Sequence, residues 1–265
     1  RHTRSDRDWS SDVCSSDLTC VTLTYDQEHL PKDNSLNLRD WQLFMKRLRK
    51  SRYKKVGKFK IYDRIPYYQV GEYGPETLRP HHHGIIFNTY FDDMERTQQG
   101  SKSGQPMWVS EELNDLWRCG QCYISEVTYE TCAYVSGYVL KKAKSKEDKE
   151  RETERVDLVT GEVYNVVPEF ATMSRRPGLA GEWLTRHLGD VYPSDEVVRI
   201  GTKNTYKPPR YYDRRLEEIN PVMYEKVKAK RMEEGKAKRI THDTPSRRTA
   251  REKIVKARLG LRSGR

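Results

Sequence analysis

Several short stretches of the chain alternate apolar and polar residues, and this period of two predicts β-strands. The strands are expected at 19–25, 67–72, 81–88 and 121–127, with a shorter one at 197–200. Within the third stretch, residues 84–87 are apolar on both faces, as in a central strand that other layers cover on both sides. These stretches predict a sheet at the centre of the fold.

Other stretches repeat apolar residues at helical spacing. Trp41, Phe44 and Leu48 share one face of a helix expected at 38–50, and Asn37 precedes it as an N-cap. Further helices are expected at 110–117, 129–144, 181–188, 222–234 and 247–259. Because strands and helices interleave through short connections, the pattern predicts an α+β domain with a helical C-terminal extension.

The charge of the chain is unevenly distributed. The 265 residues carry 50 Lys and Arg against 39 Asp and Glu, a net charge of +11. Residues 222–265 hold fifteen basic and five acidic residues, and a second basic run continues from the first helix to Lys60. Such segments are either solvated, partly disordered tails and faces or phosphate-binding elements. No stretch contains the about 18 consecutive apolar residues of a membrane-spanning helix, so we expect no membrane partner.

The five cysteines do not form the regular, even-numbered pattern of a disulfide framework, and they fit a reducing compartment. Cys119 and Cys122 have the two-residue spacer of a zinc knuckle or a redox pair. No second Cys or His pair follows at zinc-site spacing, so a glycine turn leading into a strand is the favoured interpretation.

Residues 1–18 show no periodicity and no signal-peptide architecture. Residues 12–18 can be back-translated into a sequence that resembles a common sequencing adapter. We therefore expect 1–18 to be a non-native segment and exclude it from the prediction of the fold.

Three consecutive histidines lie in the strand expected at 81–88. Alternate side chains of a strand share a face, so His81 and His83 point to one side and His82 to the other. Two imidazoles on rigid backbone are suitable metal ligands, whereas His82 is expected to pack like a small aromatic residue. The alternatives are ordinary polar strand residues and a histidine tract that binds metals adventitiously.

Glu72 lies at the end of the preceding strand. A tight antiparallel pairing would bring its carboxylate beside His81 and His83; the alternative is a surface carboxylate that closes a strand. One carboxylate with two imidazoles and open positions suits Mg²⁺ or Mn²⁺ acting on a phosphate.

Tyr134 and Tyr138 lie four residues apart on an expected helix, so they share one face roughly 6 Å apart. They are either core residues or nucleophiles. Lys141 and Lys142 favour the second interpretation, because a cation near Tyr138 lowers the pKa of a phenol and can hold a substrate phosphate. Together with the histidines, the pattern suggests cleavage of a DNA strand through a phosphotyrosine.

At these residues the chain resembles a known family. His-x-His on a strand, followed by Tyr-x-x-x-Tyr-x-x-Lys on a helix, resembles the HUH endonuclease superfamily, and more closely the replication initiators of gokushovirus-type microviruses. The resemblance rests on residues 21–31, 71–83 and 127–142, with further likeness at 168–178 and 209–213. The middle position of the metal motif departs from the family, because it is usually bulky and apolar and is His82 here.

The resemblance implies a central antiparallel sheet flanked by helices in an HUH-endonuclease domain at 19–215, followed by a basic helical or partly disordered tail at 216–265. It further implies a rolling-circle replication initiator that nicks and rejoins single-stranded phage origin DNA in the host bacterial cytoplasm. In this view His81, His83 and Glu72 hold Mg²⁺ or Mn²⁺, and Tyr134 and Tyr138 alternate as nucleophiles beside Lys141 and Lys142. A host replication polymerase or helicase would be the protein partner.

Two other functions remain open from the sequence. A non-catalytic module for single-stranded nucleic acids would explain the charge and the tyrosines, but not the paired histidines. A relaxase or transposase of the same superfamily would explain the histidines, but the paired tyrosines and the downstream likeness argue against it.

Overall fold

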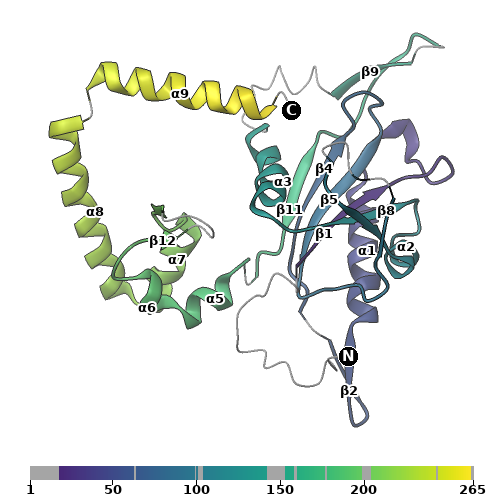
Figure 1. Cartoon of the computed structure of the whole chain (residues 1–265), viewed down its shortest axis with the longest axis horizontal. Coiled ribbons are helices and arrows are strands. Elements are labelled where there is room, and N and C mark those ends of the chain that lie inside the picture. The colour runs from purple at the N-terminus through teal and green to yellow at the C-terminus, as the bar shows by residue number, and fades with distance from the viewer. Residues whose placement is uncertain are drawn as a thin grey trace. The chain divides into compact units, whose positions relative to one another are not determined.

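The structure, a computed structural model, describes residues 18–263 except 63, 99, 101–103, 142–152, 158–159, 177, 199–203 and 243 (Figure 1). The chain divides into two compact units, residues 1–179 and 180–265. The endonuclease domain predicted at 19–215 and the tail predicted at 216–265 concern function, which this division does not test, so those boundaries stay predictions.

One sheet forms the centre of the first unit, in the strand order β11-β4-β5-β1-β8-β7-β6. Every neighbouring pair is antiparallel, which confirms the predicted sheet and the α+β class. The strands are β1 (Leu18–Thr24), β4 (Tyr67–Tyr73), β5 (Pro80–Phe87), β6 (Glu95–Arg96), β7 (Met107–Val109), β8 (Cys122–Ser125) and β11 (Phe170–Met173). Leu18, the last residue of the segment predicted to be non-native, already belongs to β1; residues 1–17 lie outside the described residues.

Two small hairpins complete the strands of this unit, and the sequence pattern did not predict either of them. They pair β2 (Tyr53–Val56) with β3 (Phe59–Tyr62), and β9 (Glu154–Val156) with β10 (Val163–Asn165). The β2–β3 hairpin falls in the basic run after the first helix, where charge obscured a short alternation on either side of Gly57.

Helices cover the two faces of the sheet differently (Figure 1). On one face, α1 (Leu38–Ser51) and α2 (Glu111–Trp117) bury a large apolar core, with Trp41, Phe44 and Trp117 fully enclosed. On the other, α3 (Tyr129–Lys141) packs Val135 into a smaller cluster with Val70. The helix predicted at 38–50 is confirmed, and its N-cap is Asn37, whose side chain accepts from the Arg39 amide.

Gly84 permits the close packing of α1 on the central strand β5. A Cβ atom at this position would lie 2.3 Å from Cη2 of Trp41, well inside contact distance. The indole ring therefore occupies the space of the missing side chain and holds the helix against the sheet.

The second unit is mainly helical. Its elements are α5 (Gly181–Arg186), α6 (Leu188–Val191), β12 (Val197–Val198), β13 (Thr205–Tyr206), α7 (Arg210–Ile219), α8 (Pro221–His242) and α9 (Pro245–Ser263). Its core is small, and buried Asp195 joins the elements through ion pairs with Lys207 and Arg231 at 2.8 Å. In the described part of the chain, no helix has both the length and the apolar character needed to cross a membrane.

Candidate metal centre and tyrosine helix

The register of three adjacent strands gathers the predicted metal ligands on one face of the sheet. In the β4–β5 pair, Glu72 lies directly opposite His81, and in the β1–β5 pair, Thr22 lies opposite His83. Opposite residues of an antiparallel pair point to the same side, and so do alternate residues of one strand. All four side chains therefore lie on the α3 face.

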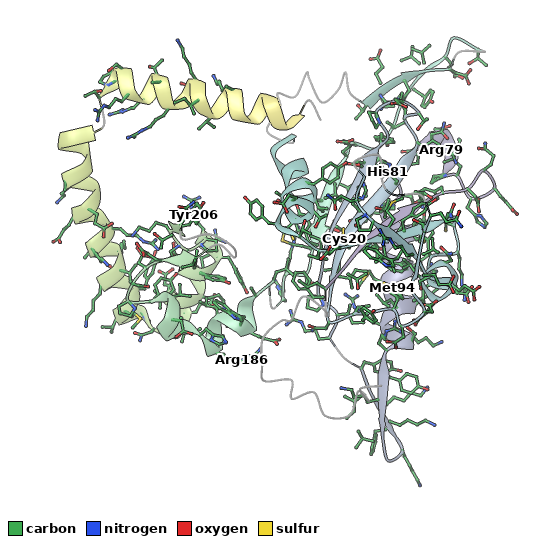
Figure 2. The ribbon with its side chains drawn as sticks, viewed as in Figure 1. Cys20, Arg79, His81, Met94, Arg186 and Tyr206 are labelled. Atoms are coloured by element: carbon green, nitrogen blue, oxygen red, sulfur yellow. The ribbon has the colours of Figure 1, made fainter. Side chains whose placement is uncertain are left out.

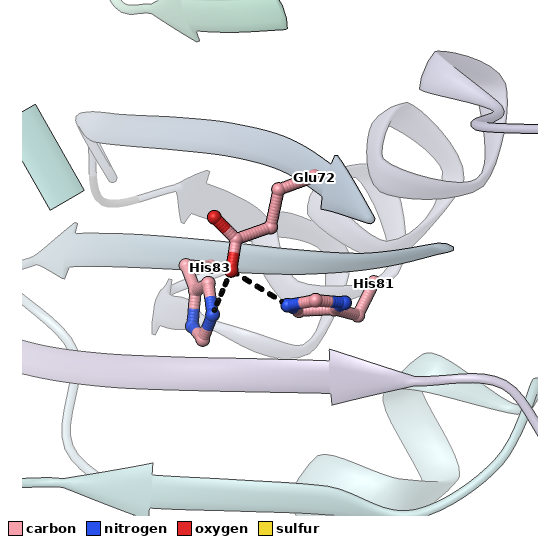
Figure 3. A group of neighbouring side chains, drawn as sticks. All are labelled: Glu72, His81 and His83. Carbon is pink, nitrogen blue, oxygen red and sulfur yellow. Dashed lines mark hydrogen bonds and ion pairs between the residues drawn. The ribbon is translucent and has the colours of Figure 1, made fainter. Parts of the chain in front are cut away.

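Figure 3 shows how the three predicted ligands converge. Oε1 of Glu72 lies 2.7 Å from Nε2 of His81 and 3.1 Å from Nε2 of His83. One ligand atom from each residue lies within 4.8 Å of the others, and no other such group of three occurs among the described residues. Glu72 is buried, and its second oxygen, Oε2, has no hydrogen-bond partner in the structure.

The outer nitrogen of each imidazole is anchored elsewhere. Nδ1 of His81 donates to the Arg79 carbonyl at 3.2 Å, and Nδ1 of His83 lies 3.0 Å from Oγ1 of Thr22. These contacts turn both Nε2 atoms toward the carboxylate, the arrangement by which proteins orient histidine ligands. A nitrogen lone pair faces a carboxylate oxygen at 2.7 Å only when the two share a proton or a cation. The donor set therefore fits a divalent ion of the Mg²⁺ or Mn²⁺ type.

The electrostatics of Glu72 agree with a cation-binding role. Burial favours the neutral carboxyl group, but hydrogen bonds from His81 and His83 outweigh burial and hold the pKa of Glu72 well below its usual range. The carboxylate is therefore ionised over the range of pH in which proteins function.

His82 faces the opposite layer, as the strand alternation predicted. Its ring is fully buried near Trp41, Trp117 and Phe170. Nδ1 accepts from the Gln69 side-chain amide at 2.9 Å, so Nε2 carries the hydrogen and donates to the Tyr25 hydroxyl at 3.2 Å. Burial lowers the pKa of His82 to about 3. A neutral imidazole with both nitrogens engaged is a structural residue.

Helix α3 presents Tyr134 to the metal-binding face. Thr128 caps the helix, because the Thr131 amide donates to Oγ1 of Thr128 at 3.2 Å. Buried Val135 then fixes the rotation of the helix against the sheet. The Tyr134 hydroxyl donates to Oε1 of Glu72 at 3.4 Å, and its ring stands perpendicular to that of His83. The Tyr134 side chain remains half exposed, at 51%.

Comparison with known sequences now extends the geometry. Residues 18–143 match the family described as replication-associated protein ORF2, and this segment contains the whole ligand set and α3. Residues 18–143 belong to that family. The prediction of a phage replication protein is thereby confirmed at the level of the family.

Three curated relatives are likewise described as replication-associated proteins. The chain is 29% identical to replication-associated protein VP4 of Bdellovibrio phage phiMH2K, over 79% of the chain and 61% of that protein. It is 32% identical to replication-associated protein ORF2 of Spiroplasma virus 4, over 74% of the chain and 57% of that protein. It is also 34% identical to replication-associated protein ORF4 of Chlamydia phage 1, over 46% of the chain and 30% of that protein. The chain thus spans about 60% of the length of the first two relatives. No solved structure matches it.

Three further predicted residues of the replication-associated region cannot be placed. The side chains of Tyr138 and Lys141 lie outside the described residues, although the α3 backbone runs through both positions, and Lys142 lies outside them entirely. Their catalytic roles stay predictions, as do those of Tyr134 and of the metal ligands.

The sequence analysis missed the residues that orient the imidazoles. Thr22 looked like one β-branched residue among several in β1, and its contact with His83 depends on strand register. Cys119 and Cys122, by contrast, behave as the simpler interpretation predicted: Gly120 forms the turn at φ +144°, and Cys122 begins β8 as a buried thiol. In the described ranges, no cluster of three metal-binding groups includes either cysteine.

Proposed function

We propose that the protein initiates rolling-circle replication of a single-stranded DNA phage by nicking and rejoining one strand at the origin through a 5′-phosphotyrosine. A single observation supports this function best. One oxygen, Oε1 of Glu72, contacts both metal-binding imidazoles and lies 3.4 Å from the Tyr134 hydroxyl. A nucleophile and a cation site therefore adjoin one another on an accessible face.

Glu72, His81 and His83 would hold Mg²⁺ or Mn²⁺. A carboxylate and two imidazoles leave coordination positions open, and hard cations with open positions take phosphate oxygens. Such an ion, when bound, polarises a phosphoryl group and stabilises a departing oxygen.

The covalent step uses the phenol oxygen of Tyr134. This oxygen attacks the scissile phosphorus, the bond from phosphorus to the 3′ oxygen breaks, and the tyrosine is left carrying the 5′ phosphate. The phenol gives up its proton, and the departing 3′ oxygen gains one. Because one phosphate ester replaces another, rejoining needs no ATP, and the free 3′ hydroxyl can prime a polymerase.

Tyr138 serves as the second nucleophile in this proposal. One helical turn separates it from Tyr134, so the two phenols can act in alternation, one holding the old end while the other cuts the new junction. Lys141 and Lys142 would hold the phosphate and favour the ionised phenol of Tyr138. Origin DNA and a host polymerase or helicase in the bacterial cytoplasm are the partners that such a reaction requires.

The test is formation of a covalent protein–DNA adduct. Protein is mixed with labelled single-stranded origin DNA and Mn²⁺ and separated by denaturing electrophoresis. We expect Tyr134→Phe combined with Tyr138→Phe to abolish the adduct while DNA binding persists. Tyr129→Phe is the matched control, since Tyr129 lies on the same helix and is similarly exposed at 47%. An undiminished adduct in the double variant, or only salt-sensitive retention by the wild-type protein, would contradict the proposal.

A further inference from the structure

The β2–β3 hairpin extends from the first unit beyond the C-terminal end of α1 (Figures 1 and 2). Its strands pair Tyr53 with Tyr62 and Val56 with Phe59, and Gly57 takes φ +61° in the two-residue turn between them. Every residue from 53 to 62 is exposed, Phe59 to 78%. The hairpin therefore contributes nothing to the described apolar clusters of its own unit.

The hairpin has two unlike faces, because opposite residues of an antiparallel pair point to the same side. One face carries two tyrosines and two lysines: Tyr53, Lys55, Lys60 and Tyr62. The other is mostly apolar: Lys54, Val56, Phe59 and Ile61. On the first face, Nζ of Lys60 lies 4.2 Å from the centre of the Tyr53 ring, so cation and aromatic ring are already arranged together.

A two-stranded hairpin with exposed apolar side chains is marginally stable alone and gains by binding a partner. The ten residues from 53 to 62 include four lysines and no acidic residue. Charge complementarity therefore favours a polyanion over a protein surface.

An arginine-rich cavity lies at the base of the hairpin. Its volume is about 530 Å³, and its described lining holds four guanidinium groups and no carboxylate: Arg49, Arg64, Arg175 and Arg176. Arg49 and Arg64 flank the hairpin in sequence. Arg49 is held by the Ile65 carbonyl at 3.2 Å and by the Tyr67 ring. Guanidinium groups gathered in this way suit phosphate oxygens.

Strand β4 connects this cavity to the metal centre. Tyr67 lines the cavity, and Glu72 lies five residues further along the same strand. At about 3.3 Å per residue the separation is roughly 17 Å, which corresponds to about five nucleotides of B-form DNA. One DNA molecule can therefore reach both places.

We propose that the hairpin and the arginine cavity bind double-stranded DNA beside the nicking site, with the hairpin entering the major groove; this rests on the proposed nicking function. The major groove admits a two-stranded β-ribbon, and apolar side chains there contact thymine methyl groups. The lysines and arginines contact the flanking phosphates. The hairpin surface thus positions duplex DNA, while Tyr134 acts on the exposed strand.

The test measures the affinity of the full chain for a short labelled DNA duplex over a range of salt concentrations. Neutralising two lysines in Lys55→Gln/Lys60→Gln should reduce the slope of log affinity against log salt by about 1.8, at about 0.9 per phosphate contact. The matched control is Lys32→Gln/Lys46→Gln, two exposed lysines elsewhere in the unit, which should leave the slope nearly unchanged. An unchanged slope in the hairpin variant overturns the proposal.

A second variant tests the apolar face without altering charge. Phe59→Ser should weaken duplex binding several-fold at an unchanged salt slope, and the thermal unfolding of both hairpin variants should match that of the wild type. Equal losses for a single strand of the same sequence would overturn the assignment to duplex DNA. The proposed nicking is read separately, because both variants should retain adduct formation on a short single strand. A missing adduct in the wild-type protein would contradict nicking alone.

Discussion

Three consecutive histidines lie on two faces of one sheet, and the two faces use them differently. His82 is enclosed by α1 and α2, is neutral, and has both ring nitrogens hydrogen-bonded. His81 and His83 remain partly exposed beside a buried carboxylate whose second oxygen lacks a partner. The residue type is the same on both faces, so the covering layer determines the role. A complete aromatic layer makes a histidine structural, and an open, charged layer makes it a ligand.

The comparison also separates stability from chemistry. The α1 face holds the larger apolar core, including two fully buried tryptophans and the close contact at Gly84. The α3 face holds the smaller cluster and keeps Glu72, Thr22 and Tyr134 near the imidazoles. Substitutions on the first face should therefore affect folding, and those on the second should affect activity.

The largest expected effect comes from removing both candidate ligands. His81→Ala/His83→Ala should slow metal-dependent nicking on the order of 10³-fold, about 4 kcal/mol, because the site loses its cation. The free energy of unfolding should change by less than about 1 kcal/mol, because both rings are partly exposed. Single-turnover cleavage and urea denaturation measure the two quantities. Nicking at the wild-type rate in Mg²⁺ would disprove the metal role.

Substitution of the middle histidine should show the opposite pattern. His82→Ala should lower the free energy of unfolding by about 3 kcal/mol, because it leaves a cavity and deprives Gln69 and Tyr25 of their partner. His82→Phe, which retains a ring, should cost less. The cleavage rate per folded molecule should stay within a few-fold of the wild type for both. A large loss of cleavage without loss of stability would assign His82 to the metal centre.

The sequence allowed the two faces to be distinguished because strand alternation depends only on backbone geometry. The N-caps of α1 and α3 and the apolar spacing of α1 were predictable for the same local reason. Thr22 and the Asp195–Arg231 ion pair were not, since each joins residues that are distant in sequence and meet only after folding. The β2–β3 hairpin was missed because its lysines suggested a solvated run, although Gly57 marks the turn.

Metal binding should stabilise the wild-type protein by mass action. At a concentration of Mn²⁺ about 100 times its Kd, the folded state gains about 2.7 kcal/mol, if the unfolded chain does not bind the ion. The Tm should rise for the wild type and for His82→Phe, and chelation should reverse the rise. His81→Ala/His83→Ala should show no such shift. An equal shift in this double variant would mean that the ion binds elsewhere.

The smallest effect is expected from the residue that orients one ligand. Thr22→Val preserves shape but removes Oγ1, which lies 3.0 Å from Nδ1 of His83. Because such contacts fix the ring orientation of a ligand, the affinity for Mn²⁺ should fall about 10-fold, within the range known for residues behind metal ligands. The control is Thr19→Val on the same strand, whose buried hydroxyl donates to the Thr89 carbonyl at 2.6 Å, away from the imidazoles. That variant should lose stability but keep its Mn²⁺ affinity. If Thr22→Val bound Mn²⁺ as tightly as the wild type, the orientation of His83 would rest on the strand alone, and the contrast between the two faces would reduce to burial.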